Sequence, residues 1–310
     1  MNKNLLEIYD LKIFPWRINW EISRECNFSC AYCVNDKSTT KVSSPVHTPE
    51  KIADIFDSTG KDWLLLITGG EPFVYPDFNQ ICLLLSQKHH LQITTNLSSP
   101  DIYKFADTIN PTKIFLISAS FHYTERKRRN LVDDFIDKCK YLNAKGFTVL
   151  VNYIAHPESL PLMEEFLTTF KLMGISSFAL ALRGEYNGKK YPESYTENDL
   201  ELVKKYVLEE SIELSSALGK LNYYGRYCTA GQTYFFMNPL GDVSRCATLQ
   251  KPFGNLFEKN VCFGNKLTPC IAKNCNDVYC GVAAVTNKKA CKLSVFLEKK
   301  KYKKINYLIF

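Results

Sequence analysis

The chain has 310 residues, of which 45% are hydrophobic and 23% are charged, a composition typical of a globular protein. No stretch approaches 18 uninterrupted apolar residues, and the N-terminus lacks the apolar core of a signal peptide, so the sequence predicts a cytoplasmic protein without a membrane span. The net charge of +7 is modest and gathers in EKKKYKK (298–304), which we interpret as a solvated tail and not as a nucleic-acid-binding surface.

Short apolar runs alternate with helical patterns over the first two thirds of the chain. The predicted strands are 17–23, 63–68, 91–96, 113–120, 147–154 and 176–182. The predicted helices start near residues 48 and 76 and cover 100–108, 130–146, 159–172 and 196–208. This alternation implies βα units and a parallel sheet, so we expect an α/β fold of the partial (β/α)6 TIM-type barrel kind, with an open doubly wound sheet as the alternative.

The pattern changes after about residue 210 to turns, glycines and cysteines. The stretch YFFMNPLGDVSRC (234–246) predicts a β-hairpin whose turn covers 238–242. Seven of the 12 cysteines lie from residue 228 onward, and in a reducing compartment they favour metal ligation over disulfides. We therefore expect a core domain over 1–210 and a small cysteine-rich domain containing a β-hairpin over 211–310.

Polar signatures follow the first four predicted strands. They are CNFSCAYC (26–33), GGEP (69–72), TTN (94–96) and SASFH (118–122). Because the carboxyl ends of parallel strands meet at one edge, we expect these signatures to share a single rim. The soft thiolates of Cys26, Cys30 and Cys33 suit a [4Fe–4S] cluster with one iron lacking a protein ligand, and an incomplete zinc site is the alternative.

The pairing of this cysteine triplet with Gly69-Gly70-Glu71-Pro72 resembles the radical S-adenosylmethionine (radical SAM) superfamily, over roughly residues 17–185. The resemblance implies a [4Fe–4S] cluster whose open iron chelates S-adenosylmethionine. It further implies that an electron from the reduced cluster cleaves this molecule to methionine and a 5′-deoxyadenosyl radical, which abstracts a hydrogen atom from the substrate. A reductant of the flavodoxin or ferredoxin type is the implied partner.

The resemblance also implies residues that bind S-adenosylmethionine, although no glycine-rich adenine motif follows the sixth predicted strand. The expected contacts are Gly69, Gly70 and Glu71 with the methionine amino group, Thr95 and Asn96 with the nucleoside, Ser118 or Ser120 with the ribose, one of Arg126, Arg128 and Arg129 with the methionine carboxylate, Asn152 near the end of the fifth strand, and Leu180 or Leu182 with the adenine. From their places on the rim, the candidates for moving a proton or binding a hydroxyl are His122, Tyr123, Arg183 and Glu185.

The C-terminal cysteines carry a second resemblance. Cys228-x12-Gly241-x4-Cys246 resembles the opening of the SPASM and twitch domains, which hold auxiliary [4Fe–4S] clusters, although the full SPASM spacing is absent. This implies one auxiliary cluster on Cys228, Cys246, Cys270 and either Cys275 or Cys280, with two clusters or a zinc ribbon as the alternatives. Cys82 and Cys139 fall in apolar helical stretches and are expected to be buried small hydrophobes.

Three function classes are compatible with these motifs. The favoured one is an enzyme that dehydrogenates or epimerises a sugar, an aminocyclitol or a similar small molecule, because the short chain and single auxiliary cluster resemble twitch-containing enzymes of that kind. The second is an enzyme that modifies a ribosomally synthesised precursor peptide. A non-enzymatic electron-transfer module explains the cysteines but not the glycine–glutamate loop.

Overall fold

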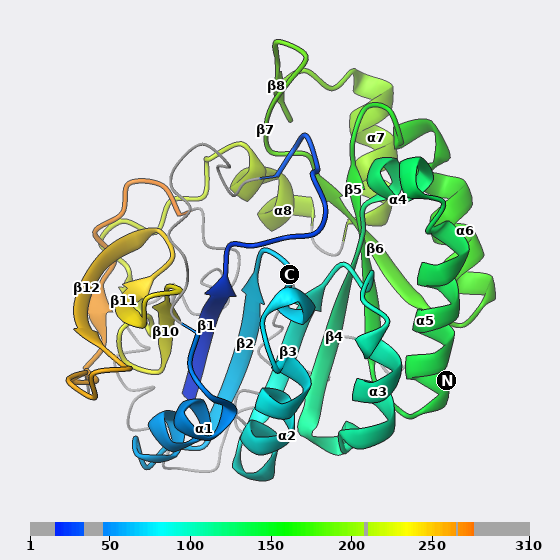
Figure 1. Cartoon of the computed structure of the whole chain (residues 1–310). Helices are drawn as coiled ribbons and strands as arrows, with labels where there is room; N and C mark the ends of the chain where they lie inside the picture. The colour runs from blue at the N-terminus through cyan, green and yellow to red at the C-terminus, as the bar shows by residue number, and fades with distance from the viewer. Residues whose placement is uncertain (1–15, 34–45, 208–209, 265, 276–310) are drawn as a thin grey trace, which may run out of the picture.

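A computed structural model describes residues 16–33, 46–207, 210–264 and 266–275. Its central feature is a nine-stranded sheet in the order β12-β11-β10-β1-β2-β3-β4-β5-β6 (Figure 1). Six strands run parallel in sequence order, and they are β1 (Trp16–Ser23), β2 (Trp63–Gly69), β3 (His90–Thr95), β4 (Ile114–Phe121), β5 (Val149–Ala155) and β6 (Ser176–Ala181). The predicted α/β fold with a six-unit partial barrel is therefore confirmed, and the described sheet does not close.

Helices cover one face of the parallel strands (Figure 1). They are α1 (Pro49–Asp57), α2 (Phe78–Lys88), α3 (Asp101–Thr108), α4 (Tyr123–Arg129), α5 (Val132–Ala144) and α6 (Met163–Leu172), with the 3-10 turns η2 (Pro72–Val74), η3 (Pro111–Lys113) and η4 (Leu160–Leu162). Every second residue of a strand points to the same face of the sheet, and on this face the apolar side chains pack against the helices. For example, the ring centroids of Trp20 on β1 and Phe56 on α1 lie 5.4 Å apart. Burial of these apolar faces forms the main core.

The C-terminal part of the chain continues the same sheet. Strand β10 (Tyr234–Met237) runs parallel to β1, and β11 (Asp242–Cys246) and β12 (Leu249–Asn255) extend the sheet in antiparallel fashion. The hairpin predicted over 234–246 is thus confirmed, and Asn238 Oδ1 closes its turn by accepting the N–H of Leu240 at 2.9 Å and of Asp242 at 3.0 Å. The division into two domains at residue 210 stays a prediction, because β10 and β1 share hydrogen bonds across it.

Several elements lie where the sequence predicted none. Helix α4 precedes α5, and a short hairpin of β7 (Gly184–Tyr186) and β8 (Lys189–Tyr191) follows β6. Helix α8 (Glu210–Ala217) and strands β9 (Tyr227–Cys228) and β13 (Thr268–Pro269) were also not predicted. Helix α7 (Glu197–Tyr206), in contrast, lies within the helix predicted over 196–208. Among the described residues no helix is long and apolar enough to cross a membrane. The basic run 298–304 lies outside the described residues.

Candidate active site

The cysteine loop, residues 24–33, leaves the carboxyl end of β1 and passes over the ends of the neighbouring strands (Figure 1). Cys26 and Cys33 are exposed, whereas Cys30 is buried. Phe28, between the first two cysteines, is buried and anchors the loop in the protein. The loop thus presents two thiols outward and holds the third within the structure.

Gly69 and Gly70 dock the end of β2 against the start of this loop. Gly70 N–H donates to Ser23 O at 2.7 Å, and Glu71 N–H donates to Glu25 O at 2.8 Å. A Cβ atom on Gly69 would lie 2.1 Å from Ser23 O, and one on Gly70 would lie 2.0 Å from Glu25 O, so a larger residue would push the two backbones apart. Glycine is required here because two segments of the chain approach each other closely. Contact of these glycines with the methionine amino group stays a prediction.

Glu71 is buried and its carboxylate is occupied by the protein. Oε1 accepts the Thr95 hydroxyl at 2.7 Å and the Phe73 N–H at 3.1 Å, while Oε2 accepts the Asn96 N–H at 2.6 Å. Burial raises the pKa of Glu71 from its ordinary value, and these hydrogen bonds act in the opposite direction. The carboxylate therefore ties the loop after β2 to the end of β3.

Asn96 connects β3 to the cysteine loop. Its Oδ1 accepts the Ser98 N–H at 2.9 Å, which directs Nδ2 toward Asn27 Oδ1 at 3.0 Å and Cys26 Sγ at 3.9 Å. The buried Arg126 guanidinium donates to Asn96 O and stacks 4.1 Å from the Phe135 ring. Burial lowers the pKa of Arg126 to about 10, so it remains a cation at neutral pH. Asn96 thus lies beside Cys26, and Thr95, one residue earlier, contacts Glu71, so the ends of β2 and β3 meet the cysteine loop as the rim prediction requires.

Helix α4 contacts the cysteine loop at a second point, next to Cys30. Glu125 Oε2 accepts the Ser29 N–H at 3.3 Å, and it also accepts Arg128 Nη2 at 2.8 Å and Arg129 Nε at 3.2 Å. Burial acts to raise the pKa of Glu125, but the Arg128 hydrogen bond and the Ser29 N–H hold it below its ordinary value. Arg128, a candidate for the methionine carboxylate, is paired with Glu125 and lies largely exposed.

His122 and Tyr123 are adjacent in sequence but diverge in the structure. His122 Nδ1 lies 3.0 Å from Tyr32 Oη, within the cysteine loop, while the Tyr123 ring packs 5.1 Å from Phe166 on α6. Loss of water around the His122 ring, reinforced by the Arg126 charge, lowers its pKa to about 4, so the imidazole is neutral at pH 7. The structure places His122 at the site and Tyr123 in the helical layer.

His156, directly after β5, is a site residue that the sequence reasoning missed. It is buried, and its ring centroid lies 4.9 Å from Tyr32 and 4.2 Å from Tyr186 on β7. Within the described part of the chain its Nε2 has no hydrogen-bond partner. A histidine one residue beyond a strand that points to the rim was the available signal.

The other predicted contacts spread over β4 to β7. Asn152 Nδ2 donates to Ser118 Oγ at 3.1 Å, and Ser120 pairs with Asn152 in the strand register, so these three form one polar row. Leu182 is buried after β6, and its N–H donates to Tyr195 Oη at 2.8 Å. Arg183 follows it, and Glu185 lies exposed on the β7–β8 hairpin. Ligand contacts by these residues stay predictions.

The chemistry of the cysteine loop fits an iron–sulfur cluster. Burial, then the charges of Glu125, Cys26 and Cys33, raise the pKa of Cys30 to about 12, so its thiol keeps its proton at neutral pH unless a metal displaces it. Cys26 Sγ accepts the Phe28 N–H at 3.4 Å, the kind of contact that stabilises a thiolate ligand. Among the described residues no three His, Cys, Asp or Glu side chains are arranged for a single metal ion.

A second group of cysteines is brought together by the C-terminal strands. Cys228, Cys246, Cys270 and Cys275 are all buried in one cluster of side chains with Leu64 and Leu66 of β2. Burial and the charges of Cys228 and Cys275 raise the pKa of Cys270. These are the first three predicted auxiliary ligands and one of the two candidates for the fourth. Cys280 and Cys291 lie outside the described residues, and Cys262 is exposed.

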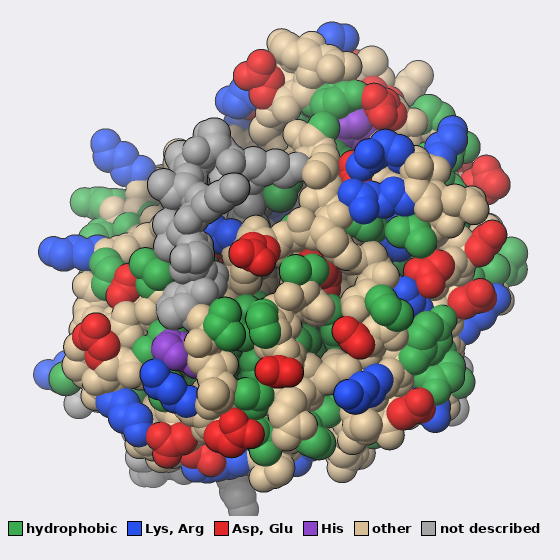
Figure 2. Space-filling model, in the orientation of Figure 1, with side chains coloured by type: hydrophobic (Ala, Val, Ile, Leu, Met, Phe, Trp, Pro, Cys, Tyr) green, Lys and Arg blue, Asp and Glu red, His purple; other side chains and the backbone are tan. Residues whose placement is uncertain are grey.

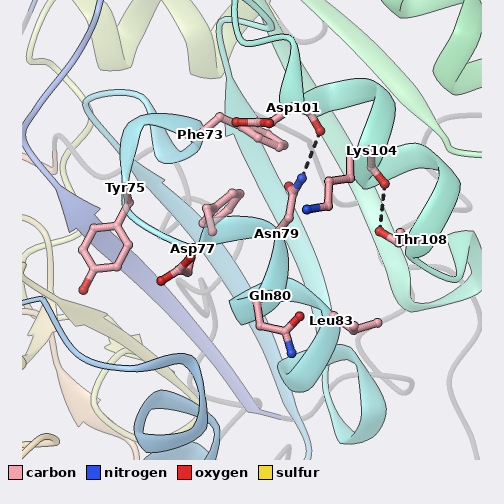
Figure 3. Close-up of a pocket in the computed structure, with 10 residues that line it drawn as sticks. Phe73, Tyr75, Asp77, Asn79, Gln80, Leu83, Asp101, Lys104 and Thr108 are labelled. Carbon is pink, nitrogen blue, oxygen red and sulfur yellow. Dashed lines mark hydrogen bonds between the residues drawn. The ribbon is translucent and has the colours of Figure 1, made fainter.

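A pocket of about 250 Å³ lies elsewhere, on the helical layer between α2 and α3 (Figure 3). Its lining includes Asp77, Asn79 and Lys104, and Asn79 Nδ2 bridges the two helices by donating to Asp101 O at 3.0 Å. None of the predicted site residues lines it. The strand ends, and not this pocket, therefore carry the candidate chemistry.

Comparison with known proteins agrees with this geometry. The sequence model of the Radical SAM superfamily matches residues 20–172, from β1 to the end of α6. The chain therefore belongs to the radical SAM superfamily, whose members hold a [4Fe–4S] cluster and use S-adenosylmethionine. Its relatives include the antilisterial bacteriocin subtilosin biosynthesis protein AlbA of Bacillus subtilis, which is 23% identical over 260 residues, 78% of this chain and 58% of AlbA. The mitochondrial GTP 3′,8-cyclase of Arabidopsis thaliana is 31% identical over 130 residues, 37% of this chain and 33% of the cyclase.

Solved structures share the fold beyond the matched domain. Streptococcus suis SuiB bound to S-adenosylmethionine superposes with a TM-score of 0.59 and 19% identity, over 80% of this chain and 64% of SuiB. The enzyme anSMEcpe with bound AdoMet superposes with a TM-score of 0.56 and 15% identity, over 78% of each chain. The chain thus spans less than two thirds of AlbA and of SuiB.

Proposed function

We propose that this protein cleaves S-adenosylmethionine reductively at a cluster held by Cys26, Cys30 and Cys33. The observation that carries the proposal is the anchoring of one three-cysteine loop at two points, by Asn96 next to Cys26 and by Glu125 next to Cys30. When bound, the cluster supplies the electron that splits S-adenosylmethionine into methionine and a 5′-deoxyadenosyl radical. The chain's own residues fix the loop and bury Phe28 and Cys30 within it.

In this proposal, different rim residues contact different parts of S-adenosylmethionine. The backbone of residues 69–71 takes the methionine amino group, since the Glu71 carboxylate is occupied by Thr95 and Asn96. The polar row of Ser118, Ser120 and Asn152 suits the ribose hydroxyls, because hydroxyl and amide groups both donate and accept. The neutral His122, held by Tyr32, is placed to accept or pass a proton.

The four buried cysteines beside β2 form the auxiliary site. We propose that Cys228, Cys246, Cys270 and Cys275 hold one [4Fe–4S] cluster, because buried thiols in one group match the all-thiolate ligand set of such clusters. Strand β10 joins this group to the core sheet next to β1, which leads into the cysteine loop. A cluster held there would supply an electron acceptor for the reaction or an anchor for the substrate.

We propose a peptide as the substrate. AlbA acts in the biosynthesis of a bacteriocin, SuiB is known bound to the precursor peptide SuiA, and anSMEcpe is known bound to peptides. Dehydrogenation or epimerisation of a sugar or aminocyclitol, which the short chain and the single expected auxiliary cluster favour, is the alternative. An electron donor of the flavodoxin or ferredoxin type completes the proposed reaction.

The test is anaerobic reconstitution of the full chain, with iron counted and 5′-deoxyadenosine measured after reduction. About eight irons per chain, falling to about four with loss of 5′-deoxyadenosine in a Cys26/Cys30/Cys33 triple alanine variant, is the expected result. About four irons in the wild type, all lost in that variant, would show that the chain holds no auxiliary cluster. Uniformly deuterated candidate peptides and sugars then identify the substrate class, because only a true substrate transfers deuterium to 5′-deoxyadenosine.

A further inference from the structure

Helix α4 contacts the cysteine loop both through a hydrogen bond and through a cation–π contact. Glu125 is 7% exposed and accepts the backbone N–H of Ser29, the residue just before Cys30. The Arg129 guanidinium lies 5.0 Å from the centroid of the buried Phe28 ring. Helix α4 therefore contacts two successive loop residues: the Glu125 carboxylate binds the Ser29 N–H, and the Arg129 guanidinium makes a cation–π contact with the Phe28 ring.

The Glu125 carboxylate is itself fixed. Arg128 Nη2 and Arg129 Nε both donate to the same Oε2 atom that accepts Ser29 N–H. Figure 2 shows the Lys and Arg side chains gathered over α4, whose last turn contains Arg126, Lys127, Arg128 and Arg129. Two cations on one side and a backbone N–H on the other leave this carboxylate little freedom to turn away from the loop.

We propose that Glu125 is a positioning residue for the cysteine loop, and that its negative charge makes the cluster held there harder to reduce. The proposal rests on the proposed cluster site. A hydrogen bond to the peptide next to a ligand restricts the geometry that the ligand can adopt. A buried negative charge opposes the addition of an electron nearby, and both net charge and hydrogen bonding set the potential of iron–sulfur clusters.

Three variants separate position from charge. Glu125→Gln keeps an oxygen that can accept Ser29 N–H but removes the charge, whereas Glu125→Ala removes both. Glu25→Gln is the matched control, since Glu25 lies exposed on the same loop, where solvent screens its charge. None of the three substitutions changes Phe28, the buried aromatic residue of the loop.

The measurements are cluster loss under a chelator, reduction midpoint by EPR, and hydrogen exchange of residues 26–33 in cluster-free protein. We expect Glu125→Ala to lose the cluster about tenfold faster and to exchange faster across the loop. We expect Glu125→Gln to retain the cluster and to raise its midpoint potential, with Glu25→Gln close to wild type in every measurement.

Two outcomes would overturn the proposal. One is wild-type cluster retention and exchange in Glu125→Ala, which would remove the positioning role. The other is a midpoint for Glu125→Gln that equals that of wild type or of Glu25→Gln, which would remove the effect of the buried charge. Failure of the proposed function gives a different result, because the Cys26/Cys30/Cys33 triple alanine variant would then keep the iron of the wild type.

Discussion

Tyr32 Oη and His122 Nδ1 lie 3.0 Å apart, although 90 residues separate them in the chain. The tyrosine belongs to the cysteine loop and the histidine to the end of β4, so this contact joins the first and fourth strand ends. Phe28 lies 6.2 Å from the same imidazole between ring centroids. His122 thus packs against the cysteine loop, and its protonation is coupled to the stability of the fold around that loop.

The first prediction concerns pH. The pKa of His122 is lowered from 6.5 to about 4, so the unfolded chain binds more protons between these values and stability falls as the pH drops through them. We expect cluster-free wild type to lose about 2 kcal/mol more than His122→Gln between pH 7 and pH 4.5, less than full burial would give because the ring is half-buried. Urea denaturation at the two pH values measures this, and equal losses would contradict it.

The second prediction concerns Glu71. Its carboxylate accepts three hydrogen bonds inside the protein, and Glu71→Gln turns one of the two oxygens into a donor that must face either the Thr95 hydroxyl and the Phe73 N–H or the Asn96 N–H. We expect a loss of about 2 kcal/mol in the free energy of unfolding. Glu25→Gln, an exposed counterpart in the adjoining loop, should change it by less than about 0.5 kcal/mol. A loss for Glu71→Gln no larger than for this control would show that the carboxylate does not tie β2 to β3.

The third prediction separates crowding from backbone strain at the glycines. Gly70→Ala places a methyl group 2.0 Å from Glu25 O, whereas Gly60→Ala meets only open space but has a φ of +66°. We expect Gly60→Ala to cost about 1 kcal/mol and Gly70→Ala at least twice that, because the cysteine loop must move. Denaturation of the cluster-free proteins gives both values. Equal losses in the free energy of unfolding would mean that the loop after β2 and the cysteine loop can move apart at no free-energy cost.

The fourth prediction assigns the two groups of cysteines. Cys30→Ala should reduce 5′-deoxyadenosine formation to background, while Cys246→Ala should retain some cleavage and block turnover of the substrate. Cys262→Ala is the control, since this exposed cysteine lies outside the buried group and should leave the iron content unchanged. Undiminished 5′-deoxyadenosine from Cys30→Ala would refute the assignment of the cluster site.

The rim was predictable because its signals are local in the sequence. Hydrophobic period and length located the six parallel strands to within about two residues, and the polar signatures followed their ends. Helix α4 escaped prediction because its four consecutive basic residues give no apolar stripe, and its burial of Glu125 and Arg126 comes from neighbours distant in the chain. His156 escaped because a single histidine after a strand has no motif around it.

The sequence by itself determined the parallel α/β architecture, the three-cysteine loop and its membership in a superfamily, since strand patterns and ligand spacing are short-range properties. The tertiary structure alone decided which groups hold that loop. Glu125 reaches Ser29 across 96 residues and Asn27 reaches Ser98 across 71, and no local pattern encodes such pairs. It likewise decided that Gly70 meets Glu25 O, because a glycine in a sequence does not reveal whether a ligand or another backbone approaches it.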